Sequence, residues 1–159
     1  MKHLGIVIAD RGAAIVTVDR DKEHKLLCTG IERLPFDLGK VTERVQALTD
    51  PDGIHVIDAE GLGQALWATL GHARDPRHWR LYAGRGIERQ ALVDELLVAV
   101  QEDRFRFAPG LAEQEAMTKA LASYRRQVRD DGVIGSELVV ALLLALMPTP
   151  YKPATFWSF

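Results

Sequence analysis

The chain has 159 residues and a mass of 17.7 kDa, which favours a single domain with a sizeable core. Its 47% hydrophobic and 26% charged residues exclude a chain that is disordered throughout. Twenty basic and twenty-two acidic residues give a formal charge of −2, which excludes a strongly basic coating protein but allows a local basic face. The single cysteine, Cys28, excludes an internal disulfide framework and fits a reducing compartment.

The sequence predicts neither a leader peptide nor a membrane span. The first four residues run directly into an apolar stretch without a small-residue cleavage site. The longest apolar run, residues 138–147, is about half the length of a membrane-spanning helix. We therefore expect a soluble, cytoplasmic protein with no membrane partner.

The first 35 residues predict three antiparallel strands in a meander. Residues 5–9 and 13–18 are apolar and rich in β-branched side chains, and Asp10-Arg11-Gly12 between them is typical of a tight turn. The charged segment 19–25 predicts a second turn, and residues 26–34 predict a third strand.

From residue 38 onward, the pattern alternates between helices and strands. Apolar residues at 38, 41, 45 and 48 recur at helical spacing, and residues 54–57 predict a short strand. A helix over 62–70 ends at Gly71. The remaining chain predicts strands over 79–83 and 105–108, helices over 89–101 and 112–126, and a buried helix over 137–147 that is apolar nearly all round.

This order of elements predicts an α/β fold of the ribonuclease H-like type. In that architecture a mixed five-stranded sheet, flanked by helices, combines three antiparallel strands with two parallel ones. We expect one RNase H-like, nuclease-type domain over residues 1–148 and a proline-rich and aromatic C-terminal tail over 149–159. The tail ends Phe156-Trp157-Ser158-Phe159, and it either folds back over the core or docks a partner.

Three acidic residues are candidates for a catalytic metal site. Phosphodiester cleavage on this scaffold requires carboxylates that hold one or two divalent cations, and hard cations prefer oxygen ligands. Asp58 directly follows the strand over 54–57, at a carboxyl strand end where α/β sheets form their sites. Asp10 ends the first strand, and Glu137 lies in the first turn of the buried helix. We predict Asp10, Asp58 and Glu137 as catalytic residues and metal ligands, with Mg²⁺ or Mn²⁺ as the cofactor.

Each of these acids also has a purely structural interpretation. Asp58 suits the N-cap of the helix that follows it. The dipole at a helix N-terminus stabilises a glutamate such as Glu137. Aspartate is common in turns, which accounts for Asp10 without a catalytic role. If the first catalytic position is instead the middle of the first strand, an apolar residue from 6 to 8 occupies it, and the metal site lacks one corner.

A basic and aromatic segment, residues 72–89, is the candidate nucleic-acid surface. Five of its arginines are predicted to contact the DNA backbone: Arg74, Arg77, Arg80, Arg85 and Arg89. Arginines at 104, 106, 125, 126 and 129 could extend this surface. The alternative is a set of solvated faces on which Asp and Glu balance the basic residues, and the near-neutral total charge favours it.

Several segments, taken in order, resemble the nuclease domain of phage large terminases. Glu32-Arg33-Leu34-Pro35 and the helix over 41–48 precede Val56-Ile57-Asp58-Ala59-Glu60-Gly61-Leu62-Gly63, which is similar to the family segment Asp-Ala-Thr-Gly-Val-Gly. Residues 92–111 and the helix ending near Tyr124-Arg125 also resemble the family. Gly135-Ser136-Glu137-Leu138-Val139-Val140-Ala141 lies at the place of the family's His-Asp-Asp-Leu-Val. The resemblance covers nearly the whole chain up to residue 147, without the ATPase motor half of a large terminase.

The resemblance implies a metal-dependent endonuclease that cuts viral DNA during packaging, in a bacterial host cell and of phage or prophage origin. Its partners would be double-stranded DNA and a separate packaging motor or another phage protein. Asp58 matches the family's second metal-binding acid, and Glu137 matches the second Asp of its pair, whereas Ser136 replaces the first. An ungapped alignment puts Val7 at the first acid, and a shifted alignment puts Asp10 there. The alternative function is a degenerate, non-catalytic copy that binds DNA or a protein.

Overall fold

The computed structural model describes residues 1–9, 12–23, 25–70, 77–82, 86–126 and 136–147. Within these residues, one six-stranded sheet has the order β5-β4-β1-β2-β3-β6. Its strands are β1 (Lys2–Ala9), β2 (Gly12–Arg20), β3 (Leu26–Leu34), β4 (His55–Asp58), β5 (Trp79–Tyr82) and β6 (Phe105–Phe107). The helices are α1 (Leu38–Leu48), α2 (Gly63–Leu70), α3 (Gly86–Gln101), α4 (Gln114–Arg126) and α5 (Ser136–Leu146).

The strand pairing confirms the predicted mixed sheet and corrects its size. β1, β2 and β3 form the antiparallel meander, and β4 and β5 continue the sheet in parallel beyond β1. The expectation of five strands was wrong, because β6 adds a sixth by pairing in parallel with β3. The side chain of Phe105 explains this addition, since it is buried in the core when β6 lies along the edge of β3.

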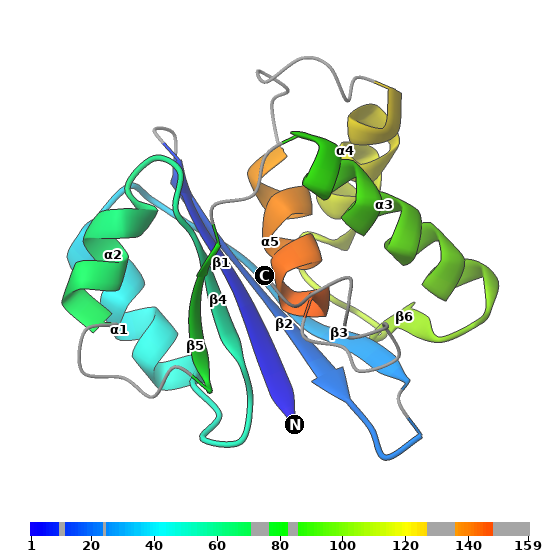
Figure 1. Ribbon diagram of the computed structural model, residues 1–159, viewed down its shortest axis with the longest axis horizontal. Helices are drawn as coiled ribbons and strands as arrows, with labels where there is room; N and C mark the ends of the chain where they lie inside the picture. The colour runs from blue at the N-terminus through cyan, green and yellow to red at the C-terminus, as the bar shows by residue number, and fades with distance from the viewer. Residues whose placement is uncertain (10–11, 24, 71–76, 83–85, 127–135, 148–159) are drawn as a thin grey trace.

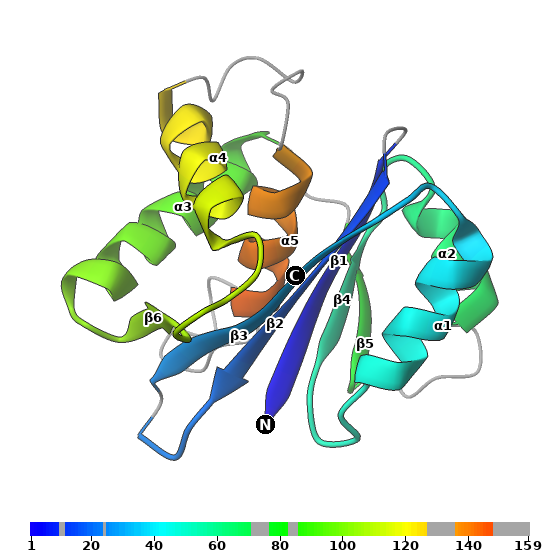
Figure 2. The same cartoon turned by 180° about the vertical axis from the view of Figure 1, so that it is seen from behind.

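Helices cover both faces of the sheet (Figures 1 and 2). α1 and α2 lie on one face and bury a cluster that includes Val41, Val45 and Ile57. On the other face, α5 lies directly on β1 and β2, and α3 and α4 pack against α5. Among the described residues, no helix combines the length and the apolar character that crossing a membrane requires.

The contact between α5 and β1 is made at a glycine. A Cβ atom on Gly5 would overlap the carbonyl oxygen of Ala141 and lie 2.7 Å from the backbone N of Ala145. The helix backbone therefore rests on the strand backbone, and no side chain separates them. Residues 138–145 of α5 are all at most 5% exposed, which confirms the predicted buried helix.

Replacing Gly5 with alanine is expected to destabilise the protein by about 3 kcal/mol or more, because the new methyl group would force α5 away from the sheet. Urea unfolding followed by circular dichroism would measure the change. The matched control is Gly39→Ala in the exposed first turn of α1, where the new Cβ would lie 3.3 Å from the exposed Asp37 Oδ1 atom and should change stability much less. Equal stability of Gly5→Ala and the wild type would contradict the close packing of α5 on β1.

A buried histidine sits on β1 beside the sheet core. The Nδ1 atom of His3 accepts a hydrogen bond from the backbone N–H of Ile54 at 3.1 Å, so the neutral ring carries its proton on Nε2. That Nε2 atom is buried and has no hydrogen-bond partner among the residues that the structure describes. Burial lowers the pKa of His3 to about 4, and the positive charges of Arg20 and the N-terminus act in the same direction.

The stability of the protein should therefore depend on pH between about 6.5 and 4. An unfolded histidine binds a proton near pH 6.5 and the folded one only near pH 4, so the stabilisation is complete above pH 6.5 and falls as the pH drops through this window. Between pH 6.5 and 4, the free energy of unfolding is expected to fall by on the order of 2–3 kcal/mol.

His3→Asn keeps an acceptor for the N–H of Ile54 and removes the titrating group. Its free energy of unfolding, measured in urea at several pH values, should fall less between pH 6.5 and 4 than that of the wild type. An unchanged pH slope would contradict the assignment of this loss to His3.

Candidate active site

Asp58, the last residue of β4, lies in the interior of the fold. Its side chain is only 3% exposed. Val56 packs in the core on the α5 side and Ile57 in the core on the α1 side, so strand alternation turns Asp58 toward α5. The parallel register pairs Ile6 of β1 with Ile57, which makes Val7 the next neighbour of Asp58 along the ladder. Val7 and Asp58 therefore lie side by side on the face beneath α5.

A tight turn after Asp58 fixes its position. The backbone N–H of Glu60 donates to the Asp58 Oδ1 atom at 3.2 Å. Gly61 has a φ of +61°, and a Cβ atom there would lie 2.6 Å from the carbonyl oxygen of Ile8. A Cβ atom on Gly63 would overlap the carbonyl oxygen of Asp58. The two glycines of Asp58-Ala59-Glu60-Gly61-Leu62-Gly63 are thus needed for the turn to close over the end of β1.

The same turn rules out one structural interpretation of Asp58. α2 begins at Gly63, five positions after Asp58, so Asp58 is not its N-cap residue. The Asp58–Glu60 hydrogen bond instead forms an Asx-type turn at the strand end.

Glu137 lies at the same end of the sheet as Asp58. α5 runs antiparallel to β1, with its N-terminus above the carboxyl ends of β1 and β4 (Figure 1). Ala141 lies over Gly5, and Glu137 is one helical turn, about 6 Å, before Ala141 on the same helix face. Val7 is two residues, about 7 Å, beyond Gly5 along β1. Glu137, which is half-buried, is therefore at about the level of Val7 and Asp58.

The described residues do not form a complete metal site. Carboxylates such as Asp58 and Glu137 suit hard divalent cations. The position on β1 next to Asp58, however, is taken by Val7, an apolar residue that is 6% exposed. No group of three His, Cys, Asp or Glu residues that could hold a metal ion is found within the part of the chain that the structure describes. The predicted first ligand, Asp10, lies outside the described residues.

Sequence reasoning missed one neighbour of this site, Tyr82. It pairs with Asp58 in the β4–β5 register, its carbonyl oxygen accepts from the N–H of Ala59 at 2.8 Å, and its side chain packs against the core beneath α5. A strand was predicted here, but only the register, which local sequence does not encode, shows which of its residues lies beside Asp58.

Two of the five arginines predicted to contact DNA have described side chains. Arg80 on the edge strand β5 and Arg77 just before it are both exposed. Arg74 and Arg85 lie outside the described residues, and Arg89 belongs to α3 with a side chain that is likewise not described.

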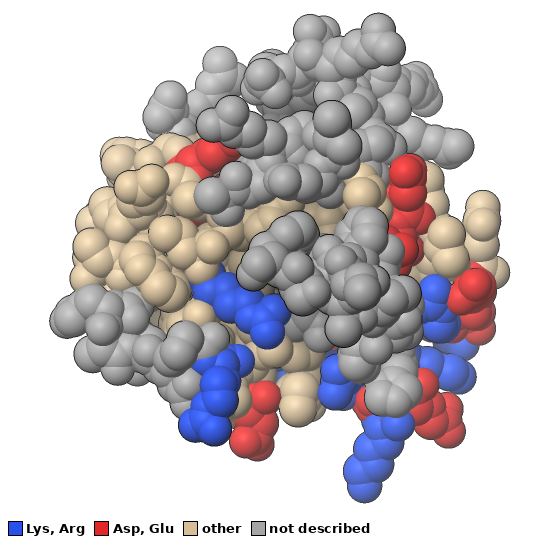
Figure 3. Space-filling model, in the orientation of Figure 1, with Lys and Arg blue, Asp and Glu red and all other residues tan. Residues whose placement is uncertain are grey.

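The further arginines that could extend this surface are partly neutralised. Arg104 pairs with Glu102 at 2.6 Å, and Arg106 pairs with Asp103 at 3.0 Å. Figure 3 shows described basic and acidic side chains next to one another on this face of the molecule. Acidic neighbours therefore balance the charges of Arg104 and Arg106, and the Arg104 side chain is only 22% exposed.

No known family model matches this sequence, and no curated protein matches it. Solved structures do match the fold. The nuclease domain of the large terminase of bacteriophage SPP1, solved with bound Mn, superposes with a TM-score of 0.57 at 12% identity, over 91% of this chain and 84% of that one. The yeast mitochondrial Holliday junction resolvase Ydc2 superposes with a TM-score of 0.54 at 7% identity, over 98% of this chain and 76% of that one. The chain thus has the RNase H-like fold of nucleases and resembles the terminase nuclease domain over most of its length.

Proposed function

We propose that this protein is a divalent-metal-dependent DNA endonuclease of the terminase nuclease type. What supports the proposal is that two acidic residues lie toward the same end of the sheet: Asp58 ends β4, and Glu137 is in the first turn of α5, whose N-terminus lies at the carboxyl ends of β1 and β4. The manganese-bound terminase nuclease domain of similar fold supports it. Cleavage of viral DNA beside a separate packaging motor, in the cytoplasm of a bacterial host, belongs to the same proposal.

In this proposal Asp58, Glu137 and Asp10 would hold Mg²⁺ or Mn²⁺. When bound, the metal would activate a water molecule and stabilise the leaving oxygen. The chain's own contribution is positioning: the N–H of Glu60 holds the Asp58 carboxylate, and burial excludes water from it, which strengthens its attraction for a cation. Exposed Arg77 and Arg80 would attract the phosphate backbone of DNA.

A specific observation favours a second candidate, a non-cleaving module that binds DNA or a protein. Val7 is the ladder neighbour of Asp58 and faces α5, where a third acid would complete the site. An apolar side chain offers no ligand to a cation. In this candidate Asp58 serves only the turn that it forms with Glu60.

Asp58→Asn tests the endonuclease proposal. The amide has nearly the shape of the carboxylate and keeps an acceptor for the Glu60 N–H, so the fold should persist. Loss of the charge should weaken Mn²⁺ binding at least tenfold and abolish metal-dependent nicking of plasmid DNA. Calorimetric titration with Mn²⁺ and gel analysis of the same samples would measure both. Wild-type protein that neither binds Mn²⁺ at millimolar concentration nor nicks DNA would refute the proposal.

Val7→Asp separates the two candidates. If the chain is a non-cleaving module, the new carboxylate beside Asp58 should create Mn²⁺ binding that the wild type lacks. If the wild type already binds metal through Asp10, then Asp10→Asn should remove that binding and Val7→Asp should add little. Val7→Asn is the matched control, because it is equally polar but carries no charge. Circular dichroism would establish that all variants fold.

A further inference from the structure

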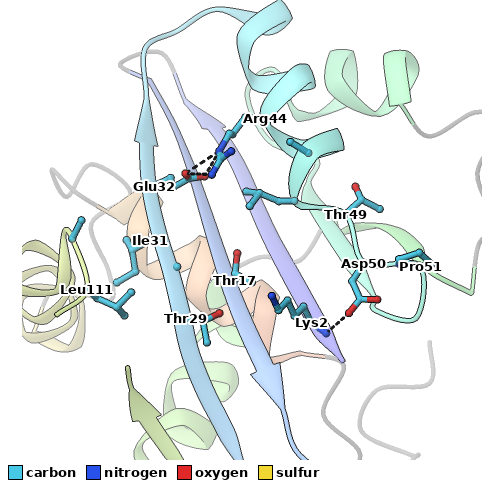
Figure 4. Close-up of a pocket in the computed structure, with 14 residues that line it drawn as sticks. Lys2, Thr17, Thr29, Ile31, Glu32, Arg44, Thr49, Asp50, Pro51 and Leu111 are labelled. Carbon is cyan, nitrogen blue, oxygen red and sulfur yellow. Dashed lines mark hydrogen bonds and ion pairs between the residues drawn. The ribbon is translucent and has the colours of Figure 1, made fainter. Parts of the chain in front are cut away.

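A groove lies on the sheet face opposite α5, far from the carboxyl end of β4. α1 and α2 cover only part of that face and leave β2 and β3 open beside α1 (Figure 4). The groove has a volume of about 690 Å³, within the range of small-molecule sites. Its floor comes from β1, β2 and β3, one wall from the end of α1 and the residues that follow it, and the other from the connection before α4.

A β-bulge places two threonines on the floor of this groove. Thr17 pairs with Gly30 and Val18 pairs with Cys28, so Thr29 is an extra residue in β3. The bulge keeps Cys28 in the core on the α5 side while Thr29 lines the groove. A Cβ atom on Gly30 would lie 3.3 Å from the Thr17 Oγ1 atom, so the glycine leaves that hydroxyl uncrowded.

Three hydrogen-bond donors converge on this floor. The Lys2 side chain extends across the sheet toward Thr17 and Thr29 (Figure 4). Thr17 is 7% exposed, and within the described part of the chain neither threonine hydroxyl has a hydrogen-bond partner. The Lys2 ammonium forms no ion pair among the described residues. All three groups are therefore available to a ligand.

The other charged groups of the groove are already satisfied. Arg44 and Glu32 form a bidentate pair, with Nε–Oε2 and Nη2–Oε1 distances of 2.9 and 2.7 Å. The Asp50 carboxylate accepts the backbone N–H groups of Lys2 and Asp52, each at 2.9 Å, and these bonds lower its pKa. Asp50 therefore stays negatively charged, and Lys2 carries the positive charge in the groove that is not already in an ion pair with a described residue.

We infer that this groove binds a small molecule that has an apolar body and one anionic oxygen group, a phosphate or a carboxylate. Lys2, Thr17 and Thr29 would hold the anionic group, since an ammonium and two hydroxyls are donors to such oxygens. Apolar side chains on the walls would contact the body: Ala47, Leu48, Pro51 and Leu111. This site is independent of the proposed nuclease site.

The test is a titration of ¹⁵N-labelled full-length protein followed by amide chemical shifts. Phenyl phosphate and benzoate distinguish a phosphate from a carboxylate. Inorganic phosphate and phenol, which each resemble one half of phenyl phosphate, are the controls. Saturable shifts at Thr17, Gly30 and Thr49 are expected with phenyl phosphate or benzoate, with weaker binding of either half. No saturation by 10 mM, roughly the weak limit for a specific small ligand, would overturn the inference.

Two variants locate the anionic subsite. Lys2→Met should weaken binding about tenfold, and Thr17→Val, which keeps the shape of the side chain, should weaken it several-fold. Lys40→Met, at the opposite end of α1, removes an equal charge and should leave the affinity unchanged. Equal affinities of Lys2→Met and the wild type would contradict the assignment of the groove as an anion site.

Discussion

The structure depends most on the direct packing of α5 against β1. Gly5 has no side chain, so the backbone of α5 at Ala141 and Ala145 lies on the strand itself. This contact brings the most apolar helix of the chain into the centre of the fold, where it buries the face of β1 and β2. It also sets the height of Glu137 above the sheet, one turn before Ala141 and beside the end of β4. The stability of the fold and the position of Glu137 therefore both depend on the contact between Gly5 and α5.

Local patterns were enough to predict the elements and the fold type. β-Branched runs marked β1 to β3, helical spacing marked α1, and the uniformly apolar run marked α5 as buried. A strand over 105–108 was predicted but was not counted in the five-stranded sheet, because Phe105–Phe107 joins that sheet by pairing with β3, which is remote in sequence. Pairing between distant strands is set by tertiary contacts, which short sequence windows do not contain.

The candidate site could be predicted only in part. Asp58 was identifiable because it follows an apolar strand, and Glu137 because it begins the buried helix. That Val7 stands next to Asp58, and that Tyr82 flanks it on the other side, follows from the β1–β4 and β4–β5 registers. The glycines at 61 and 63 have a physical role that the motif alone did not reveal, since the turn passes too close to Ile8 and Asp58 for a side chain.

The apolar residue beside Asp58 affects the electrostatics at this end of the sheet. Two carboxylates in a poorly hydrated place repel one another unless a cation or a proton lies between them. Val7 adds no third charge to that place and keeps the core packed. The fold can thus persist with either a complete or an incomplete metal site, and the nuclease fold by itself does not decide between them.

The most direct measurement is a crystal structure grown in millimolar Mn²⁺, with diffraction recorded at the manganese absorption edge. We predict an anomalous peak next to the carboxylates of Asp58 and Glu137, with Ala141 of α5 resting on Gly5. Ordered Asp58 and Glu137 side chains that point away from each other, with no anomalous peak near either, would contradict it.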